Sequence, residues 1–222
     1  MTLHLKLGFV VATLLVGAGV AQAVPIDLTL TAAAPKTLGP QSESAPCIIA
    51  GTQCQNPANF DFTNYVQGGG PSSDNNVDSP EYTIDQFPFL NFNVAIDVNT
   101  NVNASETLQA FSVFVDADGD GAGGFEEIYA FTGPALIGDA SSAGNGFGDW
   151  LLGPVDLSSY ADDALVFFTA VWDGAVAGAE SFFLVDVNAP PPPIAEPGSL
   201  MLMGIGLLAI GLLRRRKTPD RR

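Results

Sequence analysis

The clearest structural pattern in the chain is an alternation of large apolar and polar residues. Leu90, Phe92, Val94, Ile96 and Val98 occupy every second position, and a period of two places them on one face of a β-strand. Similar runs, rich in Val, Phe, Ile and Tyr and bounded by Gly, Pro, Asn or Asp, predict further short strands. These runs cover residues 26–30, 108–115, 127–131, 135–137, 150–152, 164–172 and 181–187.

No segment between the two apolar ends of the chain keeps a helical period over ten residues, and the 24 glycines and 16 prolines argue against long helices. We therefore predict an all-β fold, a single β-sandwich of immunoglobulin-like or jelly-roll type. Its core should span residues 81–188. Residues 24–80 should form an N-terminal strand followed by a loop region, because residues 35–80 are rich in Pro, Ser, Asn, Gln and Gly.

The N-terminal end has the organisation of a secretory signal peptide. Lys6 precedes an apolar run over residues 8–20, and Ala21 and Ala23 form a small-residue cleavage site. An uncleaved anchor is the alternative, but the run is short for a membrane span. We predict that residues 1–23 direct the chain to the secretion machinery and are removed, so that the mature protein begins at Val24.

The C-terminal end is organised as a membrane segment with a basic stop signal. A proline-rich linker over residues 189–199 leads into an uninterrupted apolar run over residues 200–213, which predicts a transmembrane helix. The basic stop signal follows at Arg214, Arg215, Arg216 and Lys217. Clustered basic residues stay in the cytoplasm, so residues 214–222 should form a cytoplasmic tail with the β domain on the outer side of the inner membrane.

This tail resembles the PEP-CTERM sorting signal of bacterial surface proteins. Glu196 and Pro197, the glycine-containing apolar run and the terminal basic cluster carry the resemblance, while Ala195 stands where the motif has its first proline. The resemblance covers only about the last 25 residues. It implies processing by an exosortase-like enzyme, and release to the cell surface or an exopolysaccharide matrix. An uncut C-terminal anchor is the alternative.

The charge distribution excludes several functions. Residues 24–213 contain one lysine, no arginine, no histidine and 23 acidic residues, which gives a net charge of −22. Such a field repels phosphate backbones, so nucleic acid is excluded as a partner. Because this region contains no histidine, catalysis with a histidine base is excluded, and the usual ligands of a zinc hydrolase site are missing.

The two cysteines predict a local disulfide. Cys47 and Cys54 enclose six residues, and a close pair in an exported chain most simply forms a bond that staples a loop.

One acidic motif predicts a calcium site. Asp116, Asp118 and Asp120 occupy positions 1, 3 and 5 of a loop, Gly121 position 6 and Glu127 position 12, which is the D-x-D-x-D-G-x₅-E spacing. Alternate carboxylates turn inward, the glycine permits a sharp turn, and a distant glutamate closes the shell around Ca²⁺.

The surroundings of this motif differ from those of a helix–loop–helix hand. Residues 111–115 and 128–131 flank it as predicted strands, and Gly123 stands at position 8. An acidic hairpin turn without metal is the alternative, and Glu126 is a second candidate for the closing ligand.

We expect a non-catalytic structural or adhesive protein of the cell surface or extracellular matrix. A calcium-dependent carbohydrate-binding module is the first alternative, with stacking aromatics drawn from Trp150, Trp172, Tyr65, Tyr82 and Tyr160. A glycosidase is the second, using two carboxylates such as Asp162 with Asp163 or Asp149 with Asp156.

Overall fold

The structure, a computed structural model, describes residues 24–34, 37–51, 54–65, 75–99, 105–121, 124–138, 146–174 and 178–188. The predicted signal peptide, proline-rich linker, transmembrane helix and basic tail lie outside these residues. Within the described ranges, no helix has the length and apolar character needed to cross a membrane.

The described strands form two six-stranded sheets. The first sheet contains, in order, β1 (Ile26–Asp27), β9 (Glu126–Gly138), β8 (Ser105–Asp116), β11 (Leu165–Asp173) and β5 (Asn75–Asp78), with β6 (Tyr82–Thr83) also paired to β11. The second contains β2 (Thr29–Ala32), β10 (Trp150–Asp156), β7 (Asn91–Asp97), β12 (Ser181–Asp186), β3 (Cys47–Ala50) and β4 (Thr63–Asn64). A single 3-10 turn, Ile84–Gln86, follows β6.

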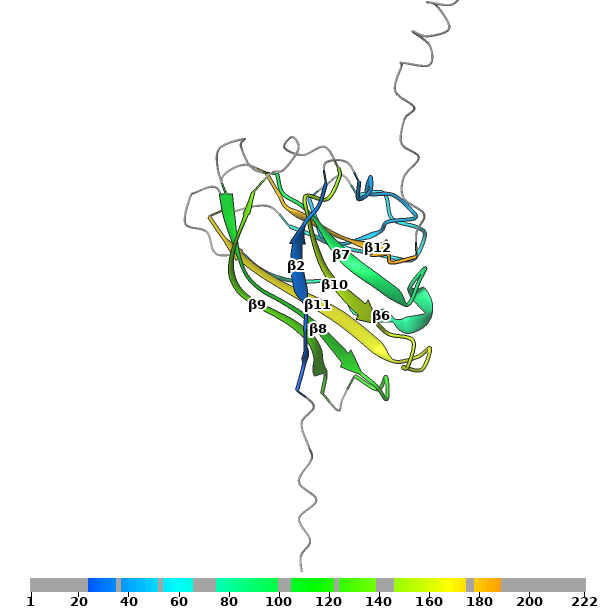
Figure 1. The fold of residues 1–222 in the computed structure, drawn as a ribbon. Coiled ribbons are helices and arrows are strands. Elements are labelled where there is room, and N and C mark those ends of the chain that lie inside the picture. The colour runs from blue at the N-terminus through cyan, green and yellow to red at the C-terminus, as the bar shows by residue number, and fades with distance from the viewer. Residues whose placement is uncertain are drawn as a thin grey trace, which may run out of the picture.

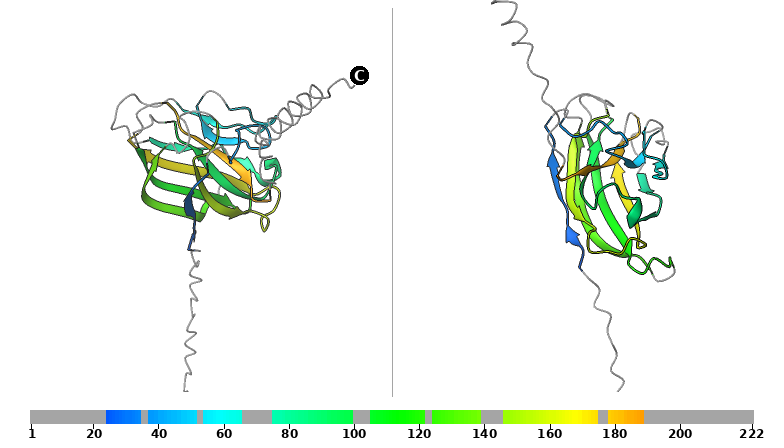
Figure 2. Two further views of the ribbon diagram at one scale, coloured as in Figure 1. Left: turned by 45° about the horizontal axis from the view of Figure 1, so that its top comes forward. Right: turned by 90° about the vertical axis from the view of Figure 1, so that its right-hand side faces the viewer.

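The two sheets pack face to face around an aromatic core (Figure 1, Figure 2). Phe111 of β8 stacks on Phe182 of β12 at a ring-centroid distance of 5.9 Å, and Phe168 of β11 meets Phe92 of β7 at 6.2 Å. Strand β11 alternates between buried and half-buried residues along its whole length, as expected when one face of a strand covers a core. The all-β prediction with two packed sheets is confirmed.

The strand order distinguishes between the two predicted sandwich types. From β7 to β12, consecutive strands alternate between the sheets except at the β8/β9 hairpin, and the orders β3-β12-β7-β10 and β5-β11-β8-β9 result. Two four-stranded sheets with these orders are the arrangement of a jelly roll. The short strands β1, β2 and β4 extend the sheets at their edges.

The prediction of a loop over residues 35–80 was wrong for strand β3. All four residues of Cys47–Ala50 are buried, and the strand lies between β12 and β4. A strand buried on both faces shows no alternation, so a periodicity argument does not find it. Strands β4 and β5 were also missed; β4 pairs with β3, and β5 pairs with β11.

The predicted strand ends were also wrong at two Gly-Pro pairs. Strand β9 continues through Gly133 and Pro134, and β10 continues through Gly153 and Pro154, where a break had been expected. The register shifts at both places, so each pair lies in a β-bulge, where a residue without an N–H donor is tolerated.

The predicted strand at residues 26–30 is divided between the two sheets. Its first part is β1, which runs parallel to β9, and its second part belongs to β2, which pairs with β10. Leu28 between them is buried, and its N–H donates to the carbonyl of Ala130.

Candidate metal centre and sorting motif

The acidic loop begins where β8 leaves its sheet. Asp116, the last residue of β8, is only 3 % exposed. Its carboxylate Oδ2 accepts a hydrogen bond of 2.9 Å from the N–H of Gly121, and its carbonyl accepts one of 3.3 Å from Gly119. These bonds fold the chain back over Asp116 in a tight turn.

Two glycines permit this turn. Gly119 and Gly121 both have a φ of 67°, in the left-handed region that favours glycine. A Cβ on Gly119 would also lie 2.3 Å from the carbonyl oxygen of Asp163, so the loop rests directly on the turn before β11. The glycine that the motif requires at position 6 is therefore accompanied by a second one at position 4.

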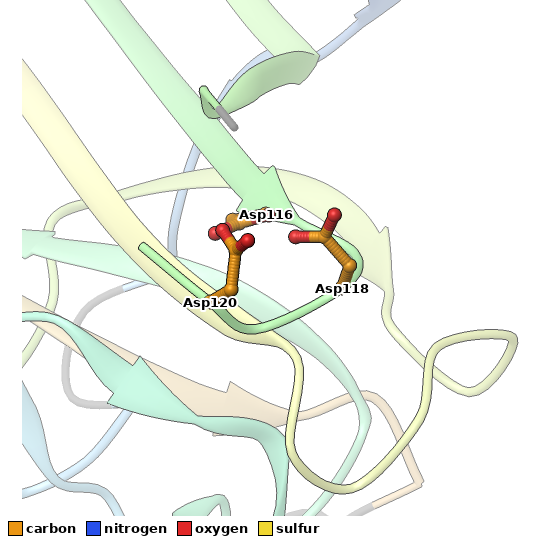
Figure 3. Close-up of side chains that lie close together, drawn as sticks. All are labelled: Asp116, Asp118 and Asp120. Atoms are coloured by element: carbon orange, nitrogen blue, oxygen red, sulfur yellow. The ribbon is translucent and has the colours of Figure 1, made fainter. Parts of the chain in front are cut away.

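Three of the four predicted ligands converge. One carboxylate oxygen from each of Asp116, Asp118 and Asp120 lies within 4.8 Å of the others, and the side chains point toward a shared space (Figure 3). Asp116 is buried, and the other two are exposed. The described residues contain no Lys, Arg or His, so no side chain among them neutralises this group.

The carboxylates perturb one another. Hydrogen bonding to Asp116 and repulsion from Asp116 and Asp120 raise the pKa of Asp118. The pKa of Asp116 is lowered, first by the hydrogen bond from Asp118 and also by the N–H groups of the loop. A divalent cation would replace this mutual repulsion with attraction, and an all-oxygen donor set suits Ca²⁺.

Glu127, the fourth predicted ligand, is not part of this group of three. It lies near the start of β9, opposite Phe114 of β8, and Glu126 lies opposite Val115. The calcium site, and the role of Glu127 in closing it, remain predictions.

An aromatic group lies beside the acidic loop, on the outer face of the first sheet. Phe114 of β8 stacks on Phe167 of β11 at 4.8 Å, and Phe125 contacts Phe167 edge-to-face at 4.7 Å. All three rings are half-buried. The sequence contains the signal that we missed, because Phe114 and Phe167 alternate with buried neighbours along their strands.

Three aromatics proposed from sequence for glycan stacking lie in the interior instead. Tyr65, Tyr82 and Trp172 are 9 %, 2 % and 1 % exposed, because their bulk fills the space between the sheets. Trp150 and Tyr160 are half-buried.

The two acid pairs proposed for a glycosidase lie in different surroundings. Asp149 precedes β10 and Asp156 ends it, so seven residues of extended chain, roughly 23 Å, separate them. Buried Asp149 accepts a hydrogen bond from the N–H of Val98. Asp162 and Asp163 are exposed neighbours in the turn before β11.

The predicted disulfide is present. Cys47 and Cys54 are bonded, with their Cα atoms 6.3 Å apart. Asn56 reinforces the loop, because its side chain accepts from the N–H of Cys47 and donates to the carbonyls of Cys47 and Phe60. The bond therefore anchors buried strand β3 to the segment that leads to β4.

The described structure is that of an acidic β protein with two packed sheets. Comparison with known protein families indicates how the chain is sorted. Residues 193–217 match the family model described as the PEP-CTERM protein-sorting motif. The match includes Glu196, Pro197 and the basic cluster that begins at Arg214. Comparison with curated proteins and with solved structures finds no match to the chain.

The sorting motif has a direct functional meaning. It implies that the chain is exported, processed by an exosortase-like enzyme and sorted to the cell surface.

Proposed function

We propose that this chain is a non-catalytic structural or adhesive protein of the bacterial cell surface or extracellular matrix, with a jelly-roll domain that Ca²⁺ stabilises. The sorting motif at residues 193–217 is the observation that carries this proposal. The strongly acidic domain and its disulfide support it, because high charge favours solubility and a disulfide persists outside the cytoplasm. In the matrix, exopolysaccharide is the expected partner.

The proposed route to the surface has two steps, both of them predictions from the sequence. Residues 1–23 engage the secretion machinery, and residues 200–213 hold the chain in the inner membrane before processing, with residues 214–222 on the cytoplasmic side. Mass spectrometry of the exported protein should find Val24 as its first residue. Deletion of residues 200–222 should remove the precursor from the membrane fraction, and unchanged fractionation would contradict the membrane step.

The calcium part of the proposal is tested by thermal unfolding of the full chain in detergent, in calcium and in chelator. At a hundredfold excess over Kd, one bound ion contributes about 2.7 kcal/mol, which raises Tm by roughly 5–10 °C for a domain of this size. A variant with Asp118→Ala and Asp120→Ala should lose this rise.

The matched control removes the same charge elsewhere. Asp78 and Glu81 are exposed, so a variant with both replaced by Ala should keep the calcium-dependent rise. Equal loss in the two variants would show that calcium acts through general charge screening and not at the loop.

The outer aromatic group favours a second candidate, a calcium-dependent carbohydrate-binding module. Phe114, Phe125 and Phe167 form an apolar surface next to the three aspartates, and sugar rings bind to such combinations of aromatic faces and oxygen ligands. Phe167→Ala should weaken retention on the organism's own exopolysaccharide in calcium. Leu136→Ala, at an exposed leucine on the same sheet, is the control, and unchanged retention in both variants would remove this candidate.

A further inference from the structure

A second acidic group lies at the opposite end of β8 from the calcium loop. Glu106, near the start of the strand, faces the interior, and Glu180 lies immediately before β12 of the other sheet. Both side chains are 0 % exposed. Ten residues separate Glu106 from Asp116 along one extended strand, about 33 Å, so the two groups are independent.

The two carboxyl groups lie close enough to act on each other, but only one of their four oxygens receives a hydrogen bond from the described residues. The N–H of Asn99 donates to Oε2 of Glu180. Oε1 of Glu180 and both carboxylate oxygens of Glu106 have no donor among the described residues. As ionised groups they are acceptors only, so they cannot satisfy each other.

Tyr65 borders the pair and Trp172 packs on Tyr65, and each carries a polar atom without a hydrogen-bond partner in the described part of the chain. Tyr65, whose side chain is only 9 % exposed, lies close enough to Glu106 and Glu180 for their charges to act on its hydroxyl. The ring of Trp172 packs edge-to-face on Tyr65 at 5.1 Å. The Tyr65 Oη and Trp172 Nε1 atoms are also buried without a partner in the described part of the chain.

Burying the Glu106 and Glu180 carboxylates costs free energy unless a proton or a bound ion compensates their charge. A buried carboxylate without a partner costs several kcal/mol. The described residues contain no basic side chain, and Lys36 is the only one in residues 24–213. The remaining means are protons on the two glutamates or a bound cation.

A shared proton satisfies the pair only in part. Burial raises the pKa of Glu180 to about 10, and the negative charge of Glu106 acts in the same direction. One proton forms one hydrogen bond and leaves a negative charge in the interior. A second proton removes that charge but still leaves buried carboxyl oxygens unpartnered. A divalent cation neutralises both charges and binds several oxygens at once.

We propose that Glu106 and Glu180 are ligands of a hard divalent cation, of the calcium type, held in the interior between the two sheets. The donors are oxygens only, which excludes the soft thiolate and imidazole chemistry of most transition-metal sites. Glu106 belongs to the first sheet and Glu180 to the turn that enters the second. The ion therefore connects the sheets at the end of the sandwich away from the acidic loop.

The position of Glu180 is defined by close packing. Gly178 has a φ of 85°, and a Cβ there would lie 2.0 Å from the side-chain nitrogen of Asn99. Asn99 in turn donates its backbone N–H to Glu180. The turn thus fixes Glu180 before any ion binds, as a preorganised ligand requires.

Trp172 provides a spectroscopic test. Terbium replaces calcium at oxygen sites, and it luminesces when a tryptophan within a few ångströms transfers excitation to it. The full chain in detergent, with Asp118→Ala and Asp120→Ala to remove the loop site, should show tryptophan-sensitised terbium emission that excess calcium displaces. Adding Glu106→Gln and Glu180→Gln should abolish the emission.

A further variant assigns the donor. Trp172→Phe should lose the emission but keep a higher Tm in calcium than in chelator, because phenylalanine retains the packing and the glutamates remain. Emission that survives both glutamine substitutions would overturn the proposal. If the double substitution prevents folding, Glu180→Gln alone is tested in the same way.

The shared-proton alternative gives a different result. If the pair holds only a proton, the loop-deficient protein should show the same Tm in calcium and in chelator. The glutamine variants should then be at least as stable as their parent, since they remove a buried charge. That combination would also overturn the proposal, while leaving the sorting function and the loop site untouched.

Discussion

Gly119 and Asp163 lie in direct backbone contact, with the Cβ position of Gly119 only 2.3 Å from the carbonyl oxygen of Asp163. This contact joins the acidic loop after β8 to the turn that precedes β11. Because β8 and β11 are neighbours in the first sheet, the geometry of the loop depends on the sheet and not on the loop alone.

Replacing Gly119 with alanine should destabilise the protein by roughly 2–4 kcal/mol, from the left-handed φ and the clash together. Gly146 has a similar φ of 79°, but no atom lies within 4 Å of the position that a Cβ would occupy. Gly146→Ala should therefore lower the free energy of unfolding by only about 1 kcal/mol. Denaturant unfolding measures both. Equal losses of stability in the two variants would show that the close approach to Asp163 does not affect stability.

Removing the disulfide should destabilise the domain. The bond closes a short loop with a sequence separation of 7, for which the entropy of the unfolded chain predicts about 2–3 kcal/mol. Cys47→Ala with Cys54→Ala and reduction of the wild-type protein should lower Tm by similar amounts. A reduced protein with an unchanged Tm would contradict the prediction.

Alkaline pH should unfold the protein through its buried tyrosines. Burial raises the pKa of Tyr82, whose hydroxyl donates to the carbonyl of Asp61 at 2.8 Å. The folded protein therefore retains this proton above the unfolded pKa of about 10, and stability is lost as the pH rises beyond that value.

Absorbance at 295 nm, followed together with circular dichroism, tests this prediction. The absorbance change that coincides with unfolding should be smaller in Tyr82→Phe than in the wild-type protein. Ionisation of Tyr82 before any loss of circular dichroism would show that the hydroxyl is accessible to solvent.

The contribution of Glu127 to the loop is testable by calcium titration. Because the three aspartates converge and Glu127 is not in their group, Asp120→Asn should weaken calcium binding by on the order of tenfold, and Glu127→Gln should weaken it less. Equal losses would show that Glu127 closes the shell, as the twelve-residue spacing predicts.

The strands were predictable wherever one face meets the core and the other meets water. The alternation over residues 90–98 identified β7, and the same signal identified the middle of β8 and most of β11. Strand β3 was not predictable in this way, because all of its residues are buried. The strand ends predicted at the Gly-Pro pairs were wrong because a β-bulge tolerates proline inside a strand.

Asp116, Asp118 and Asp120 lie close together, as the spacing of the motif suggests, since a local turn depends on local sequence. Glu127 depends on the register of a hairpin, which the sequence does not specify. Glu106 could have been found, because it continues the inward alternation of Leu108. Glu180 carries no such signal, and its meeting with Glu106 depends on the packing of one sheet on the other.

Strand β12 is the last of the described strands, yet it lies between β7 and β3 inside its sheet. A polypeptide that crosses a membrane with its N-terminus first delivers this strand after all the others. Until then, β3 has no neighbour on the side that β12 will occupy, and the second sheet is divided. The order of export thus delays completion of the second sheet until nearly the whole described domain has crossed.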